Sequence, residues 1–173
     1  MTQHPETSGR EHRFVLVDWA DPRAVELRRR MDTEIFARYE RPDDDPEPAE
    51  LTQRRRDALR VDPADIRATV LVLDGGQAIA HAALRELRGD WEVKRVIVDP
   101  DCRGRGIGRA LMLELETIAL AADVSRLILQ TGDRQPDAVA LYAGLGYTPI
   151  PIYEPYLETM PFSLCFEKHL RAA

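Results

Sequence analysis

One segment near the middle of the chain constrains the fold most, because it joins a strand, a loop and a helix in a single run. It reads Val96-Ile97-Val98-Asp99-Pro100-Asp101-Cys102-Arg103-Gly104-Arg105-Gly106-Ile107-Gly108-Arg109-Ala110-Leu111. An apolar strand ends, a Gly/Arg loop follows over residues 100–108, and apolar residues then recur at helical spacing through Ala122. Such a loop presents backbone N–H groups at the positive end of a helix, which predicts a phosphate-binding site.

Two common phosphate-binding patterns are excluded. A P-loop needs GxxxxGK followed by Ser or Thr, which the segment lacks. A dinucleotide fingerprint needs a third glycine or alanine, but Arg109 stands there when the pattern starts at Gly104, and Leu111 when it starts at Gly106.

The segments before this loop predict an antiparallel meander preceded by a strand and two helices. The turn signals Asp74-Gly75-Gly76 and Arg88-Gly89-Asp90 separate its three strands. The expected elements are strand 14–17, a helix from Asp21-Pro22 to about Tyr39, an acidic proline-rich loop 41–50, helix 51–59, and strands 69–73, 77–87 and 91–98.

After the loop, a helix is followed by a strand over 127–130, then by a helix over 136–145 and a closing strand over 162–168. A strand, a helix and a strand in succession form a crossover, so strands 91–98 and 127–130 should be parallel and right-handed. Residues 1–12 are polar and expected to be flexible, which leaves one domain over 13–171.

Composition excludes several classes. The formal net charge of -6 argues against a nucleic-acid-binding protein, because such proteins need clustered Lys and Arg. Cys102 and Cys165 lie far apart and indicate neither a disulfide framework nor a zinc site. The sequence shows no signal peptide and no membrane span, so a cytoplasmic protein without a resident metal is expected.

Two motifs resemble the GNAT (GCN5-related N-acetyltransferase) superfamily. The first is Arg103-x-x-Gly106-x-Gly108, and the second is Ala138-x-x-Leu141-Tyr142-x-x-x-Gly146-Tyr147. The resemblance covers residues 68–169 well and residues 13–60 only by position. It implies a mixed α/β fold, with a mostly antiparallel, splayed central sheet and helices on both faces.

The resemblance also implies acetyl-CoA as the co-substrate, bound between strands 96–98 and 127–130. The residues that it assigns to the cofactor are Val96, Ile97, Val98, Arg103, Gly104, Arg105, Gly106, Ile107, Gly108, Arg109, Gln135 and Ala138. Gln135 departs from the asparagine that is common in the family.

Two residues stand where family members carry out proton transfer. Tyr142 matches the tyrosine that protonates the departing thiolate, and its alternative is a core aromatic packed beside Leu141 and Leu145. Glu92 is the candidate general base, because burial in the sheet should raise its pKa. Its alternative is an ion pair with Lys94 or Arg85.

Alternation along the strand predicts Glu92, Lys94, Val96 and Val98 on one face. His81 is a second candidate base, with a histidine whose hydrogen bonds are satisfied inside the sheet as its alternative. A covalent role for Cys102 is not expected. Tyr153, Tyr156 and Ser163 are candidates for the acceptor side, with ordinary packing in a turn and a strand as the alternative.

The function expected from this resemblance is N-acetylation of a small-molecule primary amine by direct attack in a ternary complex. The acidic residues Asp43, Asp44, Asp45 and Glu47 weakly favour a cationic acceptor. A peptide or protein N-acetyltransferase and a non-catalytic acyl-CoA sensor are the alternatives. No nucleic-acid or membrane partner is expected, and the family resemblance suggests a homodimer.

Overall fold

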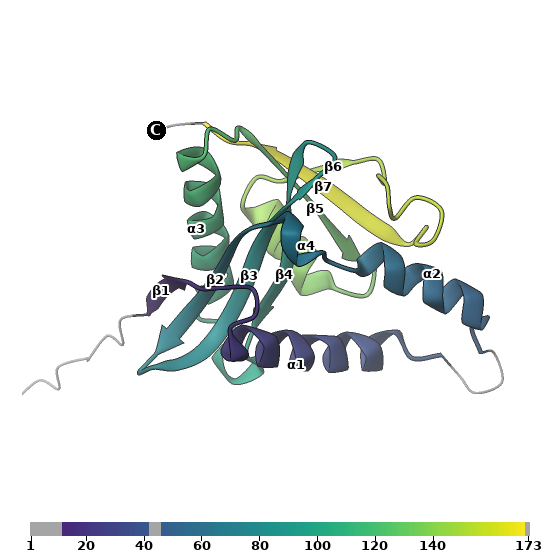
Figure 1. The fold of residues 1–173 in the computed structure, drawn as a ribbon, viewed down its shortest axis with the longest axis horizontal. Helices are drawn as coiled ribbons and strands as arrows, with labels where there is room; N and C mark the ends of the chain where they lie inside the picture. The colour runs from purple at the N-terminus through teal and green to yellow at the C-terminus, as the bar shows by residue number, and fades with distance from the viewer. Residues whose placement is uncertain (1–11, 42–45, 172–173) are drawn as a thin grey trace, which may run out of the picture.

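The computed structural model describes residues 12–41 and 46–171, which form one seven-stranded sheet with helices on both faces (Figure 1). The strand order is β1-β2-β3-β4-β5-β7-β6. The strands are β1 Arg13–Leu16, β2 Ile66–Asp74, β3 Gln77–Leu87, β4 Asp90–Val98, β5 Arg126–Gly132, β6 Thr148–Ile150 and β7 Ser163–His169. The helices are α1 Pro22–Tyr39, α2 Ala49–Leu59, α3 Ile107–Ala121 and α4 Pro136–Gly144, with short 3₁₀ turns at Pro63–Asp65 and Pro100–Cys102.

The mixed fold predicted from the sequence is confirmed. Strands β2, β3 and β4 form the antiparallel meander, and the two residues of each connecting turn have left-handed backbone. Strand β6 was not predicted, because it has only three residues, the middle one is Pro149, and so short a segment carries too little periodicity to signal a strand. Of the N-terminal segment 1–12 that was expected to be flexible, only His12 lies within the described residues.

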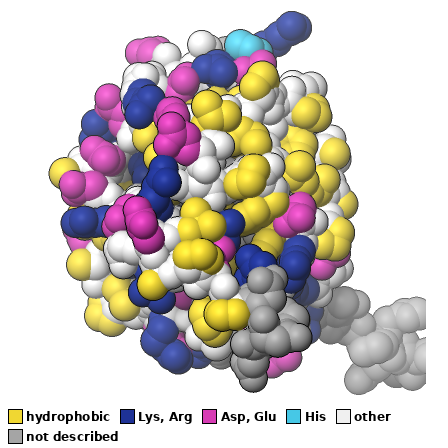
Figure 2. All heavy atoms as spheres, turned by 90° about the vertical axis from the view of Figure 1, so that its right-hand side faces the viewer, with side chains coloured by type: hydrophobic (Ala, Val, Ile, Leu, Met, Phe, Trp, Pro, Cys, Tyr) yellow, Lys and Arg dark blue, Asp and Glu magenta, His cyan; other side chains and the backbone are white. Residues whose placement is uncertain are grey.

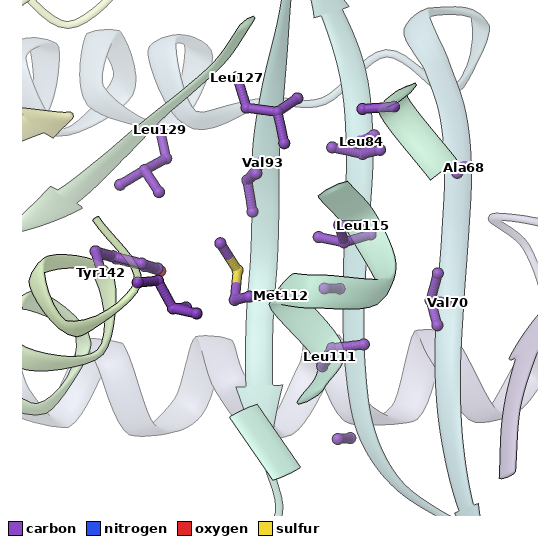
Figure 3. Packing of buried hydrophobic residues seen from close by; sticks show 14 of the residues in the cluster. Ala68, Val70, Leu84, Val93, Leu111, Met112, Leu115, Leu127, Leu129 and Tyr142 are labelled. Carbon is purple, nitrogen blue, oxygen red and sulfur yellow. The ribbon is translucent and has the colours of Figure 1, made fainter. Parts of the chain in front are cut away.

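The main core lies between the sheet and helices α3 and α4. Leu111, Met112 and Leu115 of α3 are fully buried against side chains from the central strands, as Figure 3 shows. Apolar residues at helical spacing place this stripe on the face of α3 that meets the sheet. Replacing one of these leucines with alanine typically costs about 2–5 kcal/mol, so this core fixes the helix that follows the glycine loop.

The opposite face of the sheet is covered by two units. Helix α1 buries Ala24 and Leu27 against β2 and β4. Helix α2 packs Ala58 against Tyr156 and Met160 in the segment that precedes β7.

The described residues contain no helix with the length and apolarity needed to cross a membrane. Figure 2 views the molecule from the right-hand side of Figure 1, and acidic and basic side chains are interspersed there beside hydrophobic ones.

The sheet opens between β4 and β5. These parallel strands pair only through three residue pairs, from Trp91 with Leu127 to Val93 with Leu129. Beyond Val93, β4 keeps its pairing with β3 while β5 continues along β7. The divergence leaves the end of β4 unpaired on the β5 side, which confirms the predicted splay.

A bulge in β4 changes which face its side chains occupy. The register with β3 shifts between His81 and Ala83, and Arg95 has a left-handed φ of 57°. Before the bulge, Val93 faces α3, whereas after it Val96 and Val98 pack on the α3 side and Ile97 packs under α1. The prediction that Glu92, Lys94, Val96 and Val98 share one face is therefore wrong, because one extra residue inverts the alternation.

Candidate active site

A cleft of about 520 Å³ lies where the sheet opens. Its walls are the end of β4, the glycine loop with the start of α3, the start of α4 and one side of α1. The lining residues are Met31, Glu34, Ile35, Arg38, Val96, Ile97, Val98, Cys102, Arg103, Gly104, Gly106, Ile107, Gly108, Arg109, Gln135, Asp137, Ala138, Leu141 and Tyr142. Every residue that the sequence assigned to the cofactor is among them except Arg105. The wall opposite β4 is α4, whereas the sequence had suggested β5.

The glycine loop is shaped to present backbone donors to this cleft. Gly104 and Gly106 have φ values of 74° and 76°, a left-handed backbone that other residues adopt only with strain. The N–H of Ala110 bonds to the carbonyl of Gly106, so the N–H groups of residues 107–109 have no acceptor within the helix. With the positive end of the α3 dipole, these donors form a cradle that suits a pyrophosphate.

The three arginines of the loop are held in different ways. Arg103 donates to both carboxylate oxygens of Glu34, at 3.0 and 2.6 Å, and through Nε to the carbonyl of Val98 at 3.0 Å. Arg105 donates to the carbonyl of Asp101 at 2.9 Å, and Arg109 to that of Gly144 at 3.1 Å. Arg103 and Arg109 therefore add positive charge to the cleft, while Arg105 braces the loop.

Tyr142 occupies both of the environments proposed for it. Its ring packs in the main core near the rings of Tyr147 and Phe166, with centroids 6.0 and 6.2 Å away. Tyr142 also lines the cleft, near the divergence of β4 and β5. Burial raises the pKa of Tyr142 to about 12, so the phenol stays protonated at neutral pH and can serve as a donor.

Glu92 lies on the other face of β4, inside a closed polar cluster beneath α2 and the segment before β7. One carboxylate oxygen accepts from Nε of Arg85 at 2.6 Å, and the other accepts from the hydroxyls of Tyr153 and Tyr156, each at 2.8 Å. The structure thus contains the ion pair with Arg85 that was the alternative for Glu92. Glu92 is fully buried and is not among the residues that line the cleft.

The electrostatics of this cluster differ from the sequence expectation. Burial alone would raise the pKa of Glu92, but Lys94, Arg85 and the two tyrosines more than offset it, so the pKa lies below its usual value. The expectation that the pKa of Glu92 lies above its usual value is therefore wrong, because its partners outweigh the effect of burial. Lys94 donates to the hydroxyl of Tyr156 at 2.8 Å, and burial lowers the pKa of Lys94 to about 8.

His81 supports the bulge. Its Nε2 lies 3.1 Å from the guanidinium of Arg28, which can only donate, and its Nδ1 lies 2.8 Å from the carbonyl of Arg95. His81 is therefore a neutral imidazole whose Nδ1–H donates to the residue with left-handed backbone. Burial lowers the pKa of His81 to about 4. These contacts match the alternative of a histidine satisfied within the sheet.

Sequence reasoning missed the wall that α1 contributes. Glu34 and Arg38 enter the cleft from a helix far away in sequence, and no local motif marks them. The acidic residues Asp43, Asp44 and Asp45 lie outside the described residues, and Glu47 forms an ion pair with Arg55. Tyr156 is buried in the Glu92 cluster, and Ser163 is buried and accepts from Gln130 at 3.0 Å.

The two cysteines lie in different surroundings. Cys102 lines the cleft, and Cys165 is buried near the Glu92 cluster, with a pKa raised by burial. Among residues 12–41 and 46–171, no group of three or more His, Cys, Asp or Glu side chains is placed to hold a metal ion.

Comparison with known proteins identifies relatives of this chain. The sequence model of the acetyltransferase (GNAT) family matches residues 28–147. The IAA acetyltransferase of Azospirillum brasilense is 38% identical over 107 residues, which cover 61% of this chain and 69% of that protein. The family match covers more than half of the chain, including the glycine loop over residues 100–108.

Solved structures agree. A Klebsiella pneumoniae protein assigned as an acyl-CoA N-acyltransferase has a TM-score of 0.71 and 26% identity, covering 92% of this chain and 98% of that one. An N-acetyltransferase (PaiA) of Thermoplasma acidophilum, solved in complex with coenzyme A, has a TM-score of 0.67 and 14% identity, covering 92% and 99%. At 14% identity the second likeness concerns the fold alone.

Proposed function

Because the chain belongs to the GNAT family of acetyltransferases, we propose that it acetylates the primary amine of a small molecule by direct attack on acetyl-CoA. The observation that carries the proposal is the cleft, in which a glycine cradle, an open strand end and a buried tyrosine lie together. The Azospirillum brasilense relative, named an IAA acetyltransferase, supports a small-molecule acceptor. A cytoplasmic location and a homodimer stay predictions.

The residues of the cleft suit the parts of acetyl-CoA. The N–H groups from Gly104 to Arg109 would hold the pyrophosphate, with Arg103 and Arg109 adding charge. The backbone of Val96–Val98, which β5 does not pair, would bind the pantetheine arm and the thioester carbonyl as an added strand does. Gln135 and Ala138 at the start of α4 would border the same arm.

Acetyl transfer requires two proton movements. The neutral amine forms a C–N bond with the thioester carbon, the C–S bond breaks, the amine loses one proton, and sulfur leaves as a thiolate that gains one. We assign the second movement to Tyr142, whose hydroxyl remains protonated and can donate to the sulfur. Backbone donors of β4 would stabilise the developing oxyanion.

We assign removal of the amine proton to Glu92 acting through a tyrosine. Both oxygens of Glu92 already accept hydrogen bonds, and Glu92 is not among the residues that line the cleft. Tyr153 is only partly buried, and its hydroxyl donates to Glu92. This hydroxyl can therefore accept a proton from the amine while it gives its own proton to the carboxylate of Glu92. Glu92 is held ionised at neutral pH, which keeps it ready to accept.

Calorimetric titration with acetyl-CoA tests the cofactor site. Gly106→Glu adds a carboxylate to the cradle and should abolish binding. Gly89→Glu in the β3–β4 turn is a matched control, because it adds the same charge at another glycine with left-handed backbone, φ 91°. Binding by wild type and the control but not by Gly106→Glu supports the proposal, whereas equal binding by all three contradicts it.

A screen of free amines, with detection of the released thiol, tests the reaction. Tyr153→Phe removes one hydroxyl and leaves Glu92 bonded to Tyr156, so it should lower turnover without unfolding the cluster. Acetylation of peptides but not of free amines would replace the proposal with a peptide acetyltransferase. Tight binding of acetyl-CoA without transfer to any amine would indicate a sensor.

A further inference from the structure

The wall that α1 contributes to the cleft includes one residue, Glu34, whose charge is opposite to the one that phosphate binding needs. Glu34 lines the cleft together with Met31, Ile35 and Arg38 of the same helix. Its carboxylate points at the glycine loop and takes both terminal nitrogens of Arg103, at 3.0 and 2.6 Å. The pair therefore joins α1 to the loop across the cleft that both of them line.

The contact between Glu34 and Arg103 is bidentate, and both of its partners are charged. The hydrogen bond from Arg103 lowers the pKa of Glu34, and the hydrogen bond to Glu34 raises the pKa of Arg103, so both groups are charged at neutral pH. A guanidinium fork bonded to both oxygens of a carboxylate has the geometry with which arginine also binds a phosphate. The same two N–H groups cannot serve a carboxylate and a phosphate fully at once.

We propose that Glu34 is an internal competitor for the phosphate of the acyl donor, and that donor binding transfers Arg103 from Glu34 to that phosphate. The inference rests on the proposed function, because it takes the cleft as the acetyl-CoA site. It assigns Glu34 a regulatory role: the residue lowers donor affinity and holds α1 against the loop until the donor arrives.

Arg38 makes the exchange feasible. Its guanidinium donates to the same carboxylate of Glu34 at 2.8 Å, one helical turn away. When Arg103 turns to a phosphate, Glu34 keeps this partner, so no unpaired carboxylate is left beside the incoming phosphates. Arg103 also keeps its Nε hydrogen bond to the carbonyl of Val98, which anchors the side chain while its terminal nitrogens change partner.

Glu34→Gln tests the proposal, with calorimetric titration by coenzyme A and by pantetheine, which lacks the phosphates. The variant should bind coenzyme A about three- to five-fold more tightly, the worth of a partly exposed ion pair that no longer has to be broken. Pantetheine affinity should not change. Coenzyme A binding should also weaken more steeply with added NaCl, because Arg103 now gains a new ionic partner on binding.

Two further variants separate this role from others. Glu26→Gln is the matched control, since Glu26 lies on the same helix and pairs with Arg29 and Arg30 instead of the loop. In Glu34→Gln/Arg103→Gln the gain should disappear, because the contested arginine is absent.

Weaker coenzyme A binding by Glu34→Gln would overturn the inference and make Glu34 a residue that positions Arg103. An equal gain for pantetheine would also overturn it, because the effect would not depend on phosphate. Failure of wild type to bind coenzyme A at all would overturn the proposed function itself, and the inference with it.

Discussion

The buried cluster around Glu92 makes a quantitative prediction about stability. It holds two cations, Arg85 and Lys94, against the single carboxylate of Glu92, and all three side chains are at least nine-tenths buried. In Glu92→Gln the amide oxygen can still accept from the two tyrosine hydroxyls, but its NH₂ group then faces Nε of Arg85, donor against donor. Two buried cations would remain without an anion, so the free energy of unfolding should fall by about 3–5 kcal/mol.

Removing the surplus cation should restore part of this loss. Lys94→Met keeps similar volume and takes away one hydrogen bond to Tyr156, so alone it should change the free energy of unfolding by about 1 kcal/mol or less. In the double variant Glu92→Gln/Lys94→Met only Arg85 stays unpaired. The double variant should therefore be more stable than the sum of the single effects predicts, by about 1–3 kcal/mol.

Urea unfolding followed by circular dichroism measures these values, provided that the slope with denaturant is unchanged. Glu86→Gln on neighbouring β3 is the control, because its ion pair with Arg67 is exposed and worth less than about 1 kcal/mol. If Glu92→Gln costs no more than Glu86→Gln, or if the two cluster substitutions are additive within about 0.5 kcal/mol, the account of this cluster is wrong.

Three further outcomes are expected. Tyr142→Phe should lower kcat by about 10²–10⁴-fold with little change in stability. Wild-type activity should show no loss attributable to Tyr142 up to pH 10, since the pKa of this tyrosine is about 12. Steady-state kinetics across pH measure both effects, and an unchanged kcat in the variant would mean that the tyrosine is purely structural. The pKa of His81 is about 4 in the folded protein and 6.5 in the unfolded chain, so the unfolded chain binds the proton first as the pH falls. The free energy of unfolding should therefore fall by up to about 2 kcal/mol from pH 6.5 to 5 in wild type but not in His81→Gln. An equal change of melting temperature with pH in the two proteins would contradict this. Gly108→Ala should keep the melting temperature, because the new Cβ would meet Leu141 and Val98 at ordinary distances of 3.4 and 3.6 Å. The same variant should weaken acetyl-CoA binding by at least about tenfold, because the phosphates of the donor need to approach the backbone at this position closely. An unchanged affinity would place the phosphates elsewhere.

The sequence was most informative where structure is determined locally. The glycines at 104 and 106 mark left-handed backbone, and the apolar spacing after Ile107 marks a helix, so the cradle could be located from residues close together in the chain. The two-residue turns at Gly75–Gly76 and Arg88–Gly89 could be predicted for the same reason. These features depend on backbone conformations that only certain residues adopt without strain.

The features that the sequence concealed depend on distant contacts. Arg95 carries no mark of left-handed backbone, and its conformation is supported by His81 from the neighbouring strand. Glu34 reaches the cleft from a helix whose packing angle no local pattern encodes. Arg85 and Lys94 were both candidates to pair with Glu92, but only the fold showed that Arg85 forms the ion pair while Tyr156 links the two cations.

The bulge at Arg95 divides β4 into two halves whose side chains alternate between the faces of the sheet in opposite phase. Before it, Glu92 and Lys94 point beneath α2, whereas after it Val96 and Val98 turn toward α3 and the cleft. Any chimera that exchanges this strand must carry the extra residue with it, since deleting one position would move Val96 and Val98 to the α1 side of the sheet and Ile97 to the α3 side.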